Sequence, residues 1–486
     1  MLPERFENMP ERWEAVIGLE VHAQLLTETK LFCACPTRFG EEPNRNVCPV
    51  CLGLPGALPV LNRRAVELAV RAATALGCTV HERSVFARKN YFYPDLPKGY
   101  QISQYERPLA SAGHLDIELD GERRRAGITR VHMEEDAGKN VHGVGGDSLV
   151  DLNRAGTPLV EIVGEPDLRS GAEAAAYLRA LRDVLVFLGV NDGNLEEGSF
   201  RCDANVSVRR AGDPKLGTRT EIKNVNSFRF VQRAIELEIA RQVALLESGD
   251  RVVQETRGFD HDAGRTYSLR SKEEAHDYRY FPDPDLPPLA VGAELREIAL
   301  RDMPELPADK RARYVGLGLS AQAAQTLTAH PGIARFFEDT LSRAPDALKV
   351  ANFVQTEVLR DAKLHGLEAS FSVSPAQVAE LLSLIEAGKI SGKQAKEVFA
   401  AMAGTEKLPS AIVEERGLAV VSDESTLLPI CQRLIAEHPK QVGEVRAGKK
   451  GMLGFFVGQV MKATGGAADP KLVNALLERL IREEKS

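Results

Sequence analysis

No stretch of this 486-residue sequence is apolar over the ~18–20 residues that a membrane span requires. The closest approach, residues 451–468, is interrupted by Gln459, Lys462 and several glycines. Residues 1–14 are charged from the start and contain no apolar core, so we do not expect them to form a signal peptide. We therefore expect a soluble protein of the cytoplasm.

An excess of positive charge is missing as well, since 62 Lys and Arg against 69 Asp and Glu give a net charge of −7. A nucleic acid needs Lys and Arg opposite its phosphates, so this balance weakly opposes such a partner. Two segments are nevertheless locally basic, residues 201–241 and residues 440–450. Spacing alone favours solvated faces for both segments over phosphate contacts, and the second carries Lys440, Arg446, Lys449 and Lys450.

Several catalytic motifs are absent. The sequence has no GxSxG elbow, no Gly-Gly-Ser-Ser amidase loop and no cysteine placed as a thiol nucleophile. Residues 443–450 come nearest to a phosphate loop, but Lys450 stands where Ser or Thr must hold Mg²⁺. If the protein takes part in amide chemistry, this chain does not release the nitrogen.

The length of the chain suggests about three domains at roughly 150 residues each. The first part is rich in strand patterns, with helices predicted from Ser170 to Gly189 and from Asn226 to Gly249, which favours an α+β fold over a parallel βαβ series. Beyond the proline-dense residues 278–289 the pattern is nearly all helical, with Ser374 and Ser391 as helix N-caps. We predict a mixed α/β domain with an antiparallel sheet over residues 1–294, and two all-helical domains over residues 295–405 and 406–486.

Four cysteines form a C-x-C pair followed by a C-P-x-C pair. Two close pairs can present four thiolates to Zn²⁺ in a tetrahedral arrangement. With all four positions filled by sulfur, such a zinc is structural. Disulfides or reduced thiols are the alternative, although a reducing cytoplasm disfavours disulfides. The candidate ligands are Cys33, Cys35, Cys48 and Cys51, while Cys78, Cys202 and Cys431 are predicted core residues.

Four predicted strands carry acids, histidines and cations on one face each, because alternate residues of a strand share a face. Oxygen-rich sites with a histidine suit Mg²⁺ or Mn²⁺, and adjoining Arg and Lys suit a phosphate. From the pattern alone, a site that handles phosphoryl groups and a solvated face remain equally open. The faces are Glu20 with His22 and Gln24; Arg130 with His132 and Glu134; Arg201 with Asp203 and Asn205; and Arg219 with Glu221 and Lys223.

Two further segments are ambiguous. In RVHMEEDAGK, residues 130–139, the consecutive acids Glu134, Glu135 and Asp136 must either be solvated on a loop or surround a cation. Residues 88–106 interleave lysines with aromatic residues on a turn-rich loop, which can stack bases, line a polar conduit or simply pack.

The segments GLEVHAQL, the four-cysteine segment, RKNYFYPDLPKGYQISQ, TRVHMEEDAGK, DLNRAGTPLVEIV, RCDANVSVR, TEIKNVNSF and DYRYFPDPDLPP follow one another in this order. In this order, and with GKISGKQAKEVF in the helical part, the chain closely resembles the B subunits of bacterial aspartyl/glutamyl-tRNA(Asn/Gln) amidotransferases over essentially its whole length. The resemblance implies a cradle-shaped catalytic domain and helical domains that grip the tRNA body. It also implies a heterotrimer, in which an amidase-like A subunit releases ammonia from glutamine and a small C subunit straps A to B.

In this family the B subunit uses ATP and Mg²⁺ to phosphorylate the side-chain carboxylate of misacylated Glu-tRNA(Gln) or Asp-tRNA(Asn), and ammonia then displaces the phosphate. By resemblance the metal and catalytic candidates are Glu20, His22, Glu134, Asp203 and Glu221, with Glu135 close by. Arg201, Lys223 and Arg279 are candidates for nucleotide contact, and Lys89, Tyr91, Lys98 and Glu135 for the ammonia exit. A non-catalytic, zinc-stabilised tRNA-binding subunit is the main alternative, and a small-molecule kinase acting alone is a weaker one.

Overall fold

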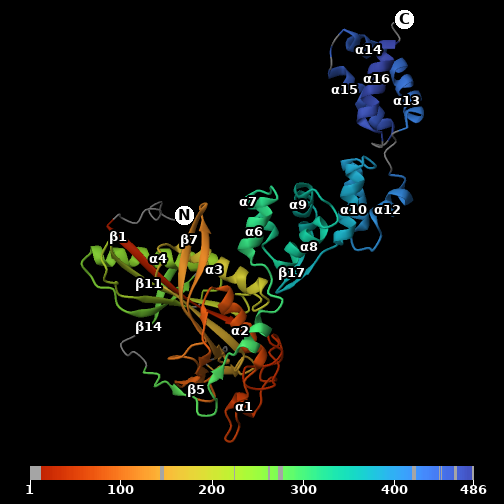
Figure 1. The fold of residues 1–486 in the computed structure, drawn as a ribbon. Coiled ribbons are helices and arrows are strands. Elements are labelled where there is room, and N and C mark those ends of the chain that lie inside the picture. The colour runs from red at the N-terminus through yellow and green to blue at the C-terminus, as the bar shows by residue number, and fades with distance from the viewer. Residues whose placement is uncertain are drawn as a thin grey trace. The chain divides into compact units, whose positions relative to one another are not determined.

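The computed structural model describes residues 12–142, 147–223, 225–260, 263–271, 277–418, 423–447, 449, 451–464 and 468–483. The chain divides into two compact units, Met1–Asp309 and Lys310–Ser486, which are described separately below (Figure 1). Within the described residues, every helix is too short or too polar to pass through a membrane.

A nine-stranded sheet forms the centre of the first unit, counted over the described residues. Neighbouring strands are antiparallel except for β12 and β13, which run parallel. The sheet confirms the predicted α+β class, and the four strand patterns seen in the sequence fall in β1, β7, β11 and β12. In order across the sheet the strands are β14 (Arg265–Ser271), β13 (Glu255–Asp260), β12 (Thr220–Lys223), β11 (Phe200–Arg210), β1 (Trp13–Gln24), β10 (Pro158–Gly164), β7 (Glu122–Glu135), β6 (Ala110–Leu119) and β2 (Thr79–Val80).

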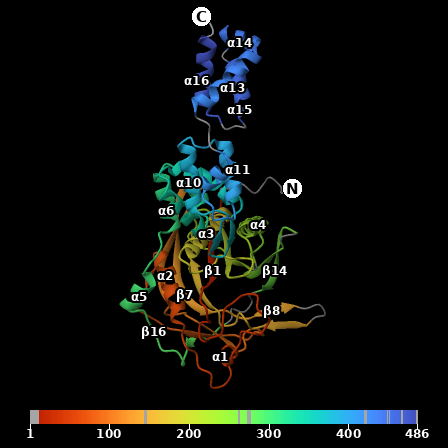
Figure 2. The same cartoon turned by 90° about the vertical axis from the view of Figure 1, so that its right-hand side faces the viewer.

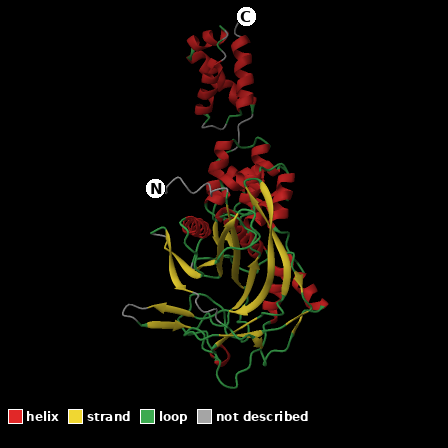
Figure 3. Cartoon of the chain, turned by 90° about the vertical axis from the view of Figure 1, so that its left-hand side faces the viewer, coloured by secondary structure: helices red, strands yellow, loops and turns green. Residues whose placement is uncertain are grey.

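Three helices, α2 (Arg63–Ala75), α3 (Gly171–Phe187) and α4 (Phe228–Glu247), pack on one face of this sheet (Figure 3). The start of α3 is fixed by Ser170, whose side chain accepts a hydrogen bond from the backbone of the first turn. Gly189 follows the end of this helix with φ of 65°, as the sequence predicts. Ser227 caps α4 in the same way as Ser170 caps α3.

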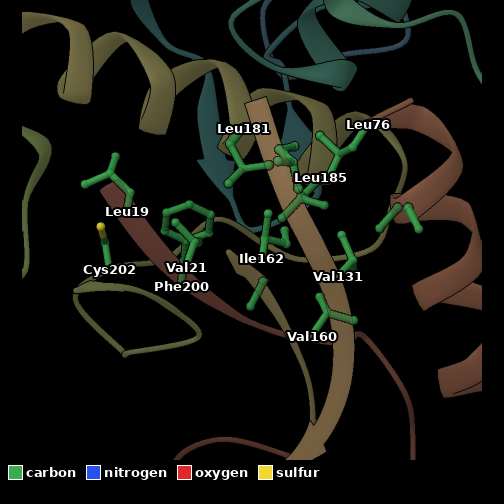
Figure 4. Close-up of a cluster of buried hydrophobic side chains, with 14 of the residues drawn as sticks. Leu19, Val21, Leu76, Val131, Val160, Ile162, Leu181, Leu185, Phe200 and Cys202 are labelled. Carbon is green, nitrogen blue, oxygen red and sulfur yellow. The ribbon is translucent and has the colours of Figure 1, made fainter. Parts of the chain in front are cut away.

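The core lies between these helices and the inward residues of the strands. Leu19 and Val21 of β1 point toward the same layer as Leu181 and Leu185 of α3 (Figure 4). Because residues alternate along a strand, the intervening Glu20 faces the opposite side of the sheet. The core prediction for the remaining cysteines is confirmed, since Cys78, Cys202 and Cys431 are all buried.

Shorter elements complete the first unit. A three-stranded sheet of β15 (Phe281–Pro282), β4 (Ala87–Asn90) and β5 (Tyr100–Ser103) brings residues from the proline-dense segment beside the lysine-rich loop. Strand β5 also contacts β7, so this small sheet lies close to the polar face of the large one. The other elements are α1 (Pro49–Leu52), α5 (Ala293–Leu300) and the strand pairs β3 (Arg83–Ser84) with β16 (Leu289–Ala290) and β8 (Lys139–His142) with β9 (Ser148–Asp151).

The second unit is helical, and the described residues form two hydrophobic cores, one within residues 314–413 and one within residues 427–481. Figure 2 shows α10 and α11 side by side. Each begins at its predicted serine N-cap, and a glutamine three residues later completes a capping box. The helices are α6 (Pro307–Gly316, which begins just before the unit boundary), α7 (Ala321–Leu327), α8 (Pro331–Leu341), α9 (Ala347–Thr356), α10 (Pro375–Glu386), α11 (Gly392–Met402), α12 (Pro409–Arg416), α13 (Glu424–Glu437), α14 (Pro439–Arg446), α15 (Gly451–Ala463) and α16 (Pro470–Glu483), with a 3₁₀ turn, η1, at Val358–Arg360.

One element of the second unit differs from the all-helical expectation. Strands β17 (Lys363–His365) and β18 (Glu368–Ser370) form a small hairpin. Gly366 has φ of 57° at its turn, a conformation that glycine adopts without steric cost. Strands of three residues are too short for alternation to show in the sequence. The predicted division into three domains stays a prediction.

Candidate functional site

Strand register brings acids and histidines together on the sheet face opposite the helices. In the pairing of β1 with β11, Glu20 lies opposite Asp203. In the pairing of β1 with β10, His22 lies opposite Glu161, and β10 in turn pairs Glu161 with His132 of β7. Polar side chains from four adjacent strands therefore form a continuous row.

The densest part of this row is a cluster of two imidazoles and two carboxylates. The His22 Nε2 atom lies 3.3 Å from Glu161 Oε2 and 3.5 Å from Glu134 Oε1. His132 Nε2 lies 3.2 Å from the same Glu161 oxygen. One ligand atom from each of His22, Glu134 and Glu161 lies within 4.8 Å of the others, which is close enough to hold a metal ion. Two carboxylate oxygens and one imidazole nitrogen form a donor set that suits Mg²⁺ or Mn²⁺.

The charges in this cluster support one another. Burial opposes the charged form of His22, but its hydrogen bond to Glu161 and the charge of Glu134 raise the pKa of the imidazole to about 9. Burial alone would raise the pKa of Glu161, yet the charge of His132 and hydrogen bonds from both imidazoles hold it well below its ordinary range. Glu161 is therefore ionised at neutral pH, as a carboxylate ligand must be, whereas His22 can bind a metal ion only after losing its proton.

A second group of acids surrounds Lys223 on the same face. Lys223 Nζ lies 2.7 Å from Asp203 Oδ2 and 3.3 Å from Glu221 Oε1. Glu20 accepts a hydrogen bond of 2.9 Å from Asn205, and burial together with neighbouring carboxylates raises its pKa. The structure thus places the five predicted metal ligands on one face but in two adjoining groups, His22 with Glu134 and Glu20 with Asp203 and Glu221.

The three consecutive acids at the end of β7 are buried, with exposures of only 3–4%. The alternative of a solvated loop is therefore wrong. Glu134 contacts the imidazoles, Glu135 accepts from Lys98, and Asp136 lies 2.9 Å from a terminal nitrogen of Arg201. Glu135 points away from Glu134 because successive side chains of a strand alternate, whereas Asp136 lies just beyond the end of β7 and contacts Arg201.

Lysines from the turn-rich loop lie near these acids. Lys98 pairs with Glu135. Lys89 Nζ lies 4.9 Å from the ring centre of Tyr278, and the Tyr91 ring lies 6.0 Å from that of Tyr278. Burial lowers the pKa of Lys89, but nearby carboxylates more than offset this and raise it. Their role on a path for ammonia stays a prediction.

Arg279 adopts an unusual backbone conformation, with φ of 44°. Such a left-handed φ is uncommon in a residue other than glycine and is found preferentially at functional sites. The Asn90 amide donates to the carbonyl of Arg279 at 2.8 Å and to that of Tyr278 at 3.1 Å, which stabilises this turn. The Arg279 side chain is 83% exposed and is therefore accessible to an anion.

The four cysteines of the paired motif converge. Cys51 Sγ lies 3.4 Å from Cys33 Sγ and 3.7 Å from the sulfur atoms of Cys35 and Cys48. A tetrahedral site with metal–sulfur distances of about 2.3 Å has sulfur–sulfur edges of about 3.8 Å, so this arrangement fits a metal ion. The disulfide alternative is not supported, since all four are free thiols. The cluster can hold a metal.

The predicted tRNA contacts lie in the second unit. Lys440 and Arg446 are exposed on α14, although the Nε atom of Arg446 also donates to a backbone carbonyl of α16 at 3.0 Å. Lys449 follows this helix and is exposed. Lys450 lies outside the described residues.

Sequence reasoning missed the central member of the cluster. Glu161 lies between the buried residues Val160 and Ile162, so alternation along β10 turns it toward the polar face. The strand pattern predicts the correct face for His132 but indicates no role for it. The signal for Glu161 was present in DLNRAGTPLVEIV, where one acid interrupts an otherwise apolar strand.

Comparisons with known proteins agree over nearly the whole chain. Residues 15–297 match the family described as the GatB/GatE catalytic domain, and residues 335–481 match the GatB domain. The chain is 58% identical over 472 residues to the aspartyl/glutamyl-tRNA(Asn/Gln) amidotransferase B subunit of Geotalea uraniireducens, an alignment that covers 96% of this chain and 98% of that relative. The proteins of the same name from Geobacter sulfurreducens and Thermodesulfovibrio yellowstonii are 57% and 52% identical, each over 97% of this chain and 99% and 100% of the relatives.

Proposed function

This chain belongs to the family of aspartyl/glutamyl-tRNA(Asn/Gln) amidotransferase B subunits, and we propose that the polar face of its large sheet activates the side-chain carboxylate of a misacylated tRNA. The chain is a subunit of a glutamine-dependent ligase that forms a carbon–nitrogen bond. The substrates are Glu-tRNA(Gln), Asp-tRNA(Asn) or both, and the products carry glutamine or asparagine.

The chemistry requires an activation step. Ammonia does not displace oxide from a carboxylate, so the carboxylate must first become an acyl phosphate that can lose phosphate. When bound, ATP supplies the phosphoryl group, and Mg²⁺ supplies positive charge to its oxygens. The protein residues must hold that charge in place and exclude water from the activated carboxylate.

The observation that carries this proposal is the convergence of His22, Glu134 and Glu161 from three adjacent strands. These residues would hold one divalent ion. Glu20, Asp203 and Glu221 lie beside them and would hold a second cation or orient the first. Their placement on a rigid sheet keeps the ligand atoms fixed, as efficient phosphoryl transfer requires.

Positive side chains next to the acids would contact phosphate oxygens. Lys223 adjoins Asp203 and Glu221, and Arg201 adjoins Asp136, so both are oriented by carboxylates. Arg279 presents an accessible guanidinium on a constrained turn. A guanidinium is always charged and can contact two phosphate oxygens at once.

The nitrogen comes from a partner, because this sequence contains no amidase nucleophile motif. We propose an amidase-like A subunit as its source and a small C subunit as the third component. The buried Lys98–Glu135 pair, with Lys89 and Tyr91 nearby, would line the entry of ammonia into the site. The cluster of Cys33, Cys35, Cys48 and Cys51 would hold a structural zinc ion, since four sulfur ligands leave no open position.

The test uses the purified trimer with matched variants of this chain. His22→Ala and Glu134→Ala should each lower ATP-dependent amidation of mischarged tRNA by at least about 100-fold, as expected for the loss of a metal ligand. Glutaminase activity of the partner should stay within a few-fold. Glu118→Gln, an exposed change on β6, is the control and should amidate normally.

Two outcomes would contradict the proposal. Equal loss of amidation and glutaminase activity would indicate that the substitutions damage the whole complex. Normal amidation by both variants would indicate a tRNA-binding subunit whose partner carries out the chemistry.

A further inference from the structure

One lysine in the first unit is completely buried. Lys30 follows β1 and has an exposure of 0%. Its Nζ atom donates to the carbonyl of Asn46 at 2.7 Å, to the carbonyl of Leu152 at 3.3 Å and to Cys51 Sγ at 3.4 Å. An ammonium group has three donors, so these contacts satisfy all of them.

A buried ammonium is costly unless a negative group lies beside it. Of the three acceptors that Nζ contacts in the described structure, Cys51 is the one that can carry a negative charge. Four thiolates around a divalent ion carry a double negative formal charge. The Lys30 ammonium halves this excess and donates a charge-assisted hydrogen bond to one sulfur.

Lys30 also connects the cysteine cluster to the loop below the acidic end of β7. Its backbone nitrogen donates to the carbonyl of Cys35 at 2.9 Å, and its side chain reaches the carbonyl of Leu152 on the other side. In the loop after Leu152, Gly156 donates to the carbonyl of Asp136 at 2.9 Å. Gly156 has φ of 85°, and a Cβ atom there would lie 3.4 Å from the Lys30 side chain.

We propose that Lys30 is a positioning residue of the four-cysteine metal site, which neutralises part of the charge on the thiolates through Cys51 and fixes the loop from Leu152 to Gly156 beneath Asp136. This inference rests on the proposed metal at the cysteines. It gives the metal ligand Cys51 a hydrogen-bond donor and connects the cysteine site to the acids at the end of β7.

The first test is a zinc competition titration of the purified complex against a chromophoric chelator. Lys30→Met retains the apolar stem but removes the charge and the donors, and should lower zinc affinity about 10–100-fold, the usual cost of losing an outer-shell partner. Lys139→Met is the matched control, because Lys139 is exposed on β8, and its zinc affinity should equal that of the wild type. Equal affinity for Lys30→Met and the control would overturn the proposal.

The second test uses Co²⁺ in place of zinc and separates a charge effect from a packing effect. Loss of the hydrogen bond to Cys51 makes that thiolate a better electron donor, so the sulfur-to-cobalt absorption band of Lys30→Met should move to longer wavelength. Lys30→Arg keeps the charge, so its absorption band should lie closer to the wild-type wavelength than the band of Lys30→Met does. An unchanged band in Lys30→Met would overturn the proposal, since a purely structural lysine would leave it unmoved.

A third measurement needs no variant and therefore does not depend on whether Lys30→Met folds. Mass spectrometry after lysine acetylation should find Lys30 protected in the metal-loaded wild-type complex and modified after chelation of the metal. Equal protection in both states would contradict the coupling. If the wild-type complex binds neither Zn²⁺ nor Co²⁺, the metal site fails and this inference fails with it, while the proposed chemistry at His22 and Glu161 is untouched.

Discussion

Glu134, Glu135 and Asp136 are adjacent in the sequence but belong to three separate networks. Glu134 joins the imidazole cluster, whereas Glu135 pairs with Lys98 and accepts from the backbone of Ile102 at 2.9 Å. These networks give each residue a distinct phenotype on substitution, so the effects of single changes on activity and on stability should separate.

Loss of the Glu135 charge should lower the stability of the first unit. The side chains of Glu135 and Lys98 are 4% and 9% exposed, so Glu135→Gln would leave a buried ammonium without its carboxylate. Breaking a buried pair in this way costs about 3 kcal/mol or more. Urea unfolding of the first unit should show this loss, with Glu118→Gln unchanged as the control. A loss below about 1 kcal/mol, the range of exposed pairs, would show that the Lys98–Glu135 contact is not a buried ion pair.

Replacement of Glu20 should stabilise the metal-free protein. Burial and neighbouring acids raise the folded-state pKa of Glu20 above its ordinary value of 4.5, so its ionisation destabilises the fold as the pH rises from 4.5 through that raised pKa. Glu20→Gln cannot ionise. In the presence of chelator, the thermal midpoint of Glu20→Gln should match that of the wild type near pH 4.5 and exceed it at pH 7.5. The excess corresponds to a gain of about 1 kcal/mol in the free energy of unfolding, while amidation falls. A variant less stable than the wild type at pH 7.5 would contradict repulsion at this site.

The residues that the sequence pointed to were those whose strand neighbours alternate clearly. Glu20 and His22 alternate with Leu19 and Val21, so their shared face followed from spacing alone. Glu161 was missed because its role depends on pairing of β10 with both β1 and β7, and register between distant strands cannot be read from one segment. The separation of the acids into two groups depends on side-chain directions and was likewise inaccessible.

Among the elements, helix ends were predictable because their signals are local. At the start of α10, Ser374 and Gln377 exchange side-chain to backbone hydrogen bonds of 3.3 and 2.8 Å. Pro375 occupies the first turn, where a missing N–H has no cost. The hairpin of β17 and β18 was not predicted, because three-residue strands show no alternation in the sequence and are recognisable only from their pairing with each other.

The capping box of α10 gives a prediction about the stability of this helix. Ser374→Ala should destabilise α10 by about 1 kcal/mol, because the backbone nitrogen of Gln377 loses its acceptor. Native-state hydrogen exchange of the α10 amides measures this. Ser383→Ala, whose hydroxyl donates to the carbonyl of Ala379 one turn earlier in the same helix, should change exchange far less. Equal effects from both changes would show that the Ser374 cap does not stabilise α10.

In the whole molecule, the strands that carry the proposed catalytic residues and the helix that carries Lys440 and Arg446 pack in separate hydrophobic cores. This organisation agrees with the proposed division between chemistry in the first unit and contact with the tRNA body in the second. The net charge of −7 leaves this division possible, because a local group of lysines can contact phosphates although acids predominate over the whole chain.

Removal of the positive charges of Lys440 and Lys449 should weaken tRNA binding without affecting catalysis. Lys440→Ala combined with Lys449→Ala should raise the tRNA KM several-fold and leave kcat unchanged. The dependence of log KM on log salt should flatten by about 1 per lost phosphate contact. Lys389→Ala, an exposed lysine elsewhere in the second unit, is the control. An unaltered salt slope would exclude this segment from the tRNA interface.

Mn²⁺ binding to the trimer, measured by electron paramagnetic resonance with the cysteine cluster loaded with zinc, tests directly whether the polar face of the large sheet holds a divalent ion. We expect tight Mn²⁺ binding by the wild type and by Glu118→Gln. An affinity at least about tenfold weaker is expected for His22→Ala and for Glu161→Gln, the ligand that the sequence did not reveal. Equal Mn²⁺ affinity in all four proteins would show that the face shared by β1, β7 and β10 does not hold the divalent ion.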